Sequence, residues 1–158
     1  MKKIIILVTI TVTALLQNGY SQQATMNEQM PSVVEAYLGV KDALVEGKMK
    51  TVTLQAEELL KAIDGVNDKT LDESIIASLK DQAIKLVKSK DIKAQRSVFE
   101  KLSNEMIIAV KAKLLNAPVY VQYCPMKKAS WLSTEKSIKN PYYGSAMLSC
   151  GNVVETIK

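Results

Sequence analysis

The feature that most constrains the fold is a sustained helical spacing of apolar residues between positions 30 and 115. Apolar side chains recur there three and four positions apart, as they do in amphipathic helices. Gly47 and the polar connections "DGVND" and "KSKD" divide this region into four helices. Because connections this short join antiparallel neighbours, we expect an all-α fold built on an up-and-down four-helix bundle.

Breaker and capping residues set the expected helix starts. These starts are Pro31, Met49, Thr70 and Asp91. Thr70 and Glu73 have the spacing of a capping box, and the last helix ends ahead of Pro118. The expected core positions are Val34, Tyr37, Leu38, Leu44, Met49, Val52, Ala56, Leu59, Leu60, Ile63, Leu71, Ile75, Leu79, Ala83, Leu86, Ile92, Phe99, Leu102, Met106 and Val110.

The composition changes after Pro118. The stretches "VYVQY" and "NVVETI" are rich in β-branched and aromatic residues, and prolines and glycines punctuate the segment between them. We expect these two stretches to pair as short strands and to close a loop that contains Trp131. Residues 118–158 then form a C-terminal loop and a short β-hairpin cap on the helices, within a single domain that spans residues 22–158.

Residues 1–21 have the features of a signal peptide. Lys2 and Lys3 precede an apolar run over residues 4–16, and small residues mark a cleavage site after Ser21. The run is shorter than the roughly 20 residues that a membrane-spanning helix needs. We therefore expect an exported protein, in the periplasm or beyond, with no membrane insertion after cleavage.

Charge and composition exclude several classes of function. Removing Lys2 and Lys3 leaves 21 − 2 = 19 basic residues against 16 acidic ones, so the formal charge falls from +5 to +3. The lysines alternate with acids, so we expect no nucleic-acid binding. Histidine is absent, which removes Ser-His-Asp and Cys-His nucleophiles and His-ligated haem. The two cysteines are far apart, unlike the Cys-x-x-Cys of thiol oxidoreductases, and we expect no enzyme.

Two short sulfur motifs stand out in the C-terminal segment. Cys124 and Met126 form Cys-x-Met, and Met147 and Cys150 form Met-x-x-Cys. If the two strands pair, four sulfur atoms could converge, and thiolate with thioether selects Cu(I) over zinc. Trp131 would add an aromatic face that shields the cation.

A disulfide is the alternative interpretation of the same residues. Two cysteines in an oxidising compartment often pair, and closing this loop would stabilise the fold by roughly 3 kcal/mol. The methionines and Trp131 would then be packing residues. Asn140 and Tyr142 lie in "NPYYG", which is typical of a turn that shapes the loop. A reversible disulfide could also alternate with a metal-bound dithiolate.

Five segments resemble a known bacterial family. They are "YVQYCPM", "WLS", "NPYYG", "MLSCG" and "AQRSVFEKLS", and they are similar to the ordered motifs of domain of unknown function 3347. The motif residues correspond here to Cys124, Pro125, Met126, Trp131, Asn140, Pro141, Tyr142, Gly144, Met147, Cys150 and Gly151. Members occur as small exported proteins and as domains of periplasmic adaptors in heavy-metal efflux pumps. The resemblance therefore implies copper or a related soft metal, and an efflux adaptor as partner.

The short "CPM" is also similar to the core of heavy-metal-binding domains near copper transporters, in which a histidine follows. Lys127 stands at that position here, a departure that counts against a histidine-assisted site and is compatible with a purely sulfur site. The leading hypothesis is a non-enzymatic periplasmic Cu(I)-binding protein for metal homeostasis or efflux, with Cys124, Met126, Met147 and Cys150 as ligands. The alternative is an interaction module without metal, which a disulfide stabilises and which docks on an exported partner such as a pump adaptor. The oligomeric state does not follow from the sequence.

Overall fold

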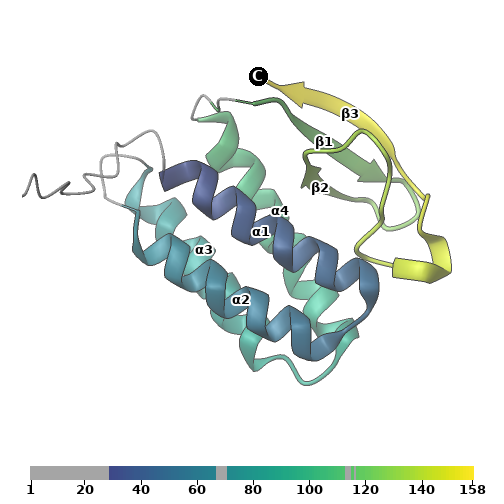
Figure 1. The fold of residues 1–158 in the computed structure, drawn as a ribbon, viewed down its shortest axis with the longest axis horizontal. Coiled ribbons are helices and arrows are strands. Elements are labelled where there is room, and N and C mark those ends of the chain that lie inside the picture. Colours follow the sequence, from purple (N-terminus) through teal and green to yellow (C-terminus); the bar gives the residue numbers. More distant parts are fainter. Residues whose placement is uncertain (1–28, 67–70, 113–114, 116) are drawn as a thin grey trace, which may run out of the picture.

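Four helices, a three-stranded sheet and one short 3-10 helix form the part of the chain that this computed structural model describes, residues 29–66, 71–112, 115 and 117–158 (Figure 1). In chain order they are α1 (Gln29–Glu46), α2 (Met49–Asp64), α3 (Glu73–Lys88), α4 (Ile92–Lys111), β1 (Val119–Cys124), β2 (Ala129–Ser133), the 3-10 helix η1 (Gly144–Met147) and β3 (Asn152–Ile157). The predicted signal peptide and the capping box at Thr70 lie outside the described residues.

The predicted helices are confirmed, and local chemistry explains their ends. Gly47 ends α1 with φ +72°, a conformation that glycine adopts without strain. The side chain of Asp91 caps α4 by accepting a hydrogen bond of 2.7 Å from the N–H of Ala94. On α3 the buried stripe contains Ile76, whereas Ile75 is only partly buried.

Successive helices pack against each other, α1 on α2, α2 on α3 and α3 on α4. The sheet covers one side of this layer, where β2 packs on α4 (Figure 1). Among the described residues, no helix is both long and apolar enough to cross a membrane.

The C-terminal segment corrects the all-α fold and its hairpin cap. The sheet has three antiparallel strands in the order β2-β1-β3. The two predicted strands do pair, with Tyr123 opposite Asn152, but β2 was not expected. The β1–β2 hairpin was missed because its turn has an unusual sequence. Lys128 occupies the left-handed region of this turn, at φ +58°. Glycine or asparagine usually marks such a position, so "PMKK" carries no hairpin signal.

One face of α4 holds the C-terminal segment against the helices. Phe99 stacks on Tyr37 of α1, with ring centroids 5.2 Å apart, and also contacts Tyr142 at 5.8 Å. The hydroxyl of Tyr37 shares a hydrogen bond of 2.7 Å with Ser103 and accepts one of 3.1 Å from the N–H of Leu132 on β2. Buried side chains from α1, α4 and β2 therefore meet in one cluster.

Candidate functional site

The two cysteine sulfurs lie in contact at one end of the sheet. Cys124 is the last residue of β1, and Cys150 lies between η1 and β3. Their Sγ atoms are 2.9 Å apart and are not joined as a disulfide. Cys124 is fully buried, whereas Cys150 is partly exposed. Antiparallel pairing of β1 with β3 brings together two residues that are 26 positions apart in the sequence.

Gly151 allows the chain to approach β1 next to Cys150. Its φ is +149°, and a Cβ atom there would lie 2.8 Å from Cη2 of Trp131 and 3.0 Å from the carbonyl oxygen of Tyr123. Real side chains do not tolerate contacts this short at a buried ring and a backbone oxygen. The position therefore requires glycine, and that glycine fixes how closely Cys150 comes to Cys124.

Asn140 fastens the "NPYYG" loop to Cys150. Its side chain is fully buried. The Nδ2 group donates a hydrogen bond of 2.7 Å to the carbonyl oxygen of Cys150, and Oδ1 accepts from the N–H groups of Tyr142 at 2.8 Å and Tyr143 at 3.3 Å. One side chain thus satisfies three backbone groups around the cysteine pair.

Replacing Asn140 with alanine should destabilise the protein by about 2 kcal/mol, since buried backbone groups would lose their partner. The measurement is equilibrium unfolding in urea. Asn104→Ala is the matched control, because Asn104 is exposed on α4 and such surface changes cost under about 0.5 kcal/mol. A loss no larger than that of the control would contradict the role given to Asn140.

Trp131 and Tyr142 form the floor of the site. Trp131 is fully buried on β2, and Tyr142 meets its ring edge-on, with centroids 5.9 Å apart and an interplanar angle of 79°. The Tyr142 hydroxyl donates a hydrogen bond of 2.6 Å to the carbonyl oxygen of Ser130. The structure places both aromatic residues in the core beneath the cysteine segment.

The two methionines are exposed next to the cysteine pair. Met126 lies in the β1–β2 turn and is 66 % exposed, and Met147 ends η1 and is 36 % exposed. The carbonyl oxygen of Met147 accepts a hydrogen bond of 3.1 Å from the N–H of Cys150. The structure therefore brings the two thiols together and leaves the thioether side chains at the surface. Over the described ranges, no three His, Cys, Asp or Glu side chains cluster as a metal site.

The two thiols differ in their tendency to ionise. Burial alone would raise the pKa of Cys124, but hydrogen bonds to its sulfur outweigh burial and lower it. The donors are the thiol of Cys150, the backbone N–H groups of Lys127 and Met126, and the side chain of Asn140. The hydrogen bond that Cys150 gives to Cys124 raises the pKa of Cys150. The contact between the two sulfurs therefore lowers the pKa of Cys124 and raises that of Cys150.

Lys127 does not place an unbalanced positive charge beside the thiols. Its Nζ lies 2.6 Å from a carboxylate oxygen of Glu100 on α4 and 5.9 Å from the centre of the Tyr142 ring. The ion pair offsets the charge and holds the turn that follows Cys124 against α4. Glu100 was not expected at the site, because its partner lies 27 positions away in the sequence.

Arg96 is a second supporting residue that sequence reasoning missed. Its Nε donates to the carbonyl oxygen of Pro141 at 3.0 Å and its Nη2 to that of Leu44 at 3.1 Å. It therefore joins the end of α1 to the "NPYYG" loop. Gly144, at φ +58°, passes so close that a Cβ atom would lie 2.7 Å from Nη2 of Arg96. In the sequence, this role of Arg96 was indicated only by its position in "AQRSVFEKLS", one of the segments that resemble the family's motifs.

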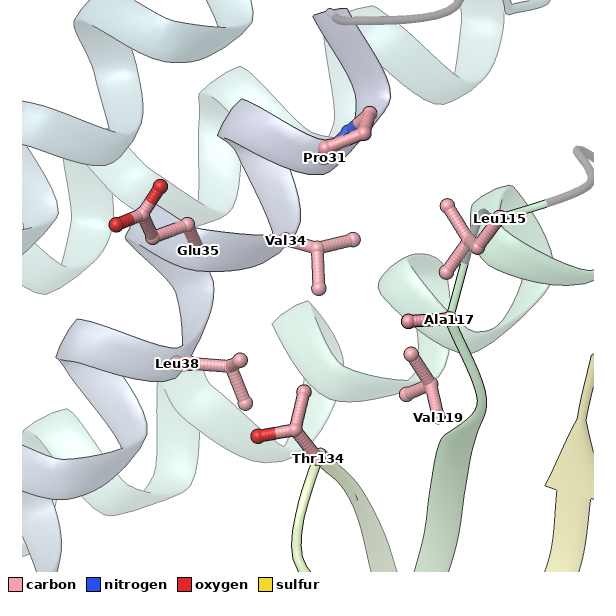
Figure 2. Close-up of a pocket in the computed structure, with 8 residues that line it drawn as sticks. All are labelled: Pro31, Val34, Glu35, Leu38, Leu115, Ala117, Val119 and Thr134. Carbon is pink, nitrogen blue, oxygen red and sulfur yellow. The ribbon is translucent and has the colours of Figure 1, made fainter.

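An apolar pocket lies at the other end of β1 from Cys124. Its volume is about 330 Å³ (Figure 2). It is lined by Pro31, Val34, Glu35, Leu38, Leu115, Ala117, Val119 and Thr134. Leu115, Ala117 and Val119 face Val34 and Leu38 of α1 across it (Figure 2). This pocket contains no sulfur and is separate from the thiol site.

The fold and the site define a small, mostly helical protein whose C-terminal sheet carries a pair of thiols in contact. Residues 33–116 match the family described as "Protein of unknown function (DUF3347)", which is more than half of the 158 residues, and the chain belongs to that family. The match begins within α1 and ends before β1, so the cysteine-bearing segment lies outside it. No curated protein matches the chain, and no solved structure does.

Proposed function

We propose that the protein binds one soft cation, Cu(I), through Cys124 and Cys150, and that it serves metal homeostasis or efflux after export to the periplasm. The observation that carries the proposal is the 2.9 Å contact between the two Sγ atoms. Two thiolates in contact supply soft anionic donors for a single ion, as Cu(I) prefers.

The residues around the thiols fit such an ion. Hydrogen bonds to its sulfur lower the pKa of Cys124, and metal binding replaces the thiol protons. Sulfurs that share a metal stand roughly 3.8 Å apart if the metal–sulfur distance is about 2.3 Å and the angle tetrahedral, so we expect Cys150 to shift outward. Cys150 is partly exposed and lies outside the strands, which leaves it more freedom to shift than Cys124.

Met126 and Met147 are the proposed neutral ligands. Both are exposed and each lies within three positions of a cysteine. Methionine is unbranched and has three rotatable bonds, so its sulfur can move toward an ion by side-chain rotation. The pairing of Lys127 with Glu100 offsets the positive charge that Lys127 would otherwise place near a bound cation.

The scaffold of the proposed site is an up-and-down order of the four helices. Support comes from the two-residue connection between α1 and α2 and from the sequential packing of α1 to α4. An efflux adaptor is the proposed recipient of the ion. The family membership is compatible with that partner, and the adaptor association itself rests on the resemblance alone.

The test is a Cu(I) titration of the reduced protein comprising residues 22–158. It is carried out in the absence of oxygen, and a chromogenic chelator competes with the protein for the ion. We expect one bound ion per chain. Cys124→Ser and Cys150→Ser should each weaken binding more than tenfold, because a neutral hydroxyl replaces a soft anionic donor. Met126→Leu and Met147→Leu should weaken it less, and Met49→Leu on α2 is the control that should change nothing. Unchanged affinity in Cys124→Ser would eliminate the assignment.

A disulfide-fixed interaction module is the second candidate, and the same sulfur contact favours it. Oxidation of the pair would close a loop of 26 positions and stabilise the fold by roughly 3 kcal/mol. The module would then dock on an exported partner without metal. Mass measurement of protein isolated from the periplasm, before and after thiol alkylation, separates the two candidates. A mass short by two hydrogens with no bound metal supports the module.

A further inference from the structure

We infer that Cys124 and Cys150 form a directional thiol–disulfide exchange site, at which a thiolate of an exported dithiol protein attacks Cys150 and Cys124 is the sulfur that leaves. This inference goes beyond cation binding and does not require it. It concerns how the pair is switched between its oxidised and reduced forms.

Access determines which sulfur is attacked. In thiol–disulfide exchange a thiolate must reach one sulfur of the bond from outside. Cys124 is fully buried in the core, whereas Cys150 is partly exposed. With the two Sγ atoms already 2.9 Å apart, Cys124 lies on the protein side of Cys150. An incoming thiolate therefore meets Cys150 first.

The structure also holds the two sulfurs differently. Cys124 is fixed in the middle strand of the sheet, opposite Ala129 of β2. Cys150 lies between η1 and β3, and its carbonyl oxygen is held by Asn140. Cys124 therefore stays in place after it leaves, close enough to attack a mixed disulfide at Cys150 in the reverse reaction.

Apolar side chains next to the pair offer a contact surface for the partner. Met126, Met147 and Leu148 are 66 %, 36 % and 44 % exposed and lie within three positions of the cysteines. Exposed apolar groups of this kind gain from being covered by a partner. The occupant we assign is an exported protein with two neighbouring thiols and an apolar surface around them.

The exchange balances in two steps. The partner's thiolate forms a bond to Sγ of Cys150, the Cys124–Cys150 bond breaks, and Cys124 leaves as a thiolate. The partner's second thiolate then attacks its own sulfur in the mixed disulfide, and Cys150 leaves as a thiolate. Both thiolates of this protein take up the two protons that the partner's thiols released. Two electrons pass from the partner, which becomes a disulfide, and the reverse sequence oxidises this protein.

The test needs no metal and is run with a chelator present. Oxidised protein comprising residues 22–158 is mixed with reduced glutathione, quenched in acid and mapped by peptide mass. The expected glutathione adduct is on Cys150. Adduct mainly on Cys124, or a disulfide that dithiothreitol cannot reduce without denaturant, would overturn the inference.

Single variants measure the same asymmetry. Reduced Cys124→Ser, which retains Cys150, should react with glutathione disulfide at least tenfold faster than Cys150→Ser, which retains Cys124. The difference should vanish in urea, where both sulfurs are exposed. Equal rates in the folded variants, with circular dichroism confirming their helices, would overturn the inference. Because no cation takes part, failure here leaves the Cu(I) result unaffected, and failure of Cu(I) binding leaves the exchange test valid.

Discussion

Replacing Phe99 with alanine is expected to lower the free energy of unfolding by about 4 kcal/mol, the usual range for a large buried aromatic residue. Phe99 is fully buried on α4 and its ring touches both Tyr37 and Tyr142. The cavity left by alanine would lie between the helices and the C-terminal segment. We therefore expect loss of the contacts that hold the "NPYYG" loop, in addition to loss of stability.

Urea unfolding measures the first effect, and proteolysis of the C-terminal segment measures the second. Ile108→Ala is the matched control on the same helix, because Ile108 is 52 % exposed and should cost under about 0.5 kcal/mol. Phe99→Leu should fall between the two, since it keeps part of the volume and loses the ring contacts. If Phe99→Ala lowered the free energy of unfolding less than Phe99→Leu does, the ring of Phe99 would not connect the helices with the C-terminal segment.

Replacing Gly151 with alanine should cost about 3 kcal/mol, because the new Cβ adds a steric clash to a strained backbone conformation. The Cβ would lie 2.8 Å from the Trp131 ring, and Trp131 is fully buried, so moving the ring would disturb the surrounding core. The segment around Cys150 must therefore shift away from β1. We expect slower disulfide formation by the Cys124–Cys150 pair and weaker Cu(I) binding.

Gly47→Ala separates the two causes of that loss. Gly47 also has a positive φ, but a Cβ atom there has no neighbour within 4 Å. Gly47→Ala should lower the free energy of unfolding by only about 1 kcal/mol, because only the backbone conformation is unfavourable there. Both variants are compared by urea unfolding and by the rate at which the reduced pair is oxidised. Equal losses in both, with an unchanged oxidation rate in Gly151→Ala, would mean that Gly151 does not position Cys150.

The helices were predictable because their signals are local. The spacing of Val52, Ala56, Leu59 and Ile63 defines the buried face of α2, and those residues are buried. Asp91 marked the start of α4 through the same capping chemistry that the structure shows. Such signals depend only on residues within one or two helical turns.

The sheet was less predictable, because part of its information is non-local. Strands β1 and β3 have β-branched sequences and were expected to pair, whereas β2 follows a turn whose left-handed position holds Lys128. Arg96 and Glu100 reach residues 45 and 27 positions away, and helical periodicity does not encode such contacts. For the candidate site, the meeting of Cys124 and Cys150 followed from strand pairing. Ligation by Met126 and Met147 stays a prediction.

The hydrogen bond from Leu132 to Tyr37 also uses a backbone N–H group of β2, a strand at the margin of the sheet. A strand at the margin of a sheet offers unused N–H and C=O groups to any extended chain, and Tyr37 and α4 occupy that side of β2. The opposite margin, β3, is solvent-accessible along nearly its whole length. Any strand addition would therefore take place at β3, whose Glu155 pairs with Lys111 of α4 at 2.6 Å.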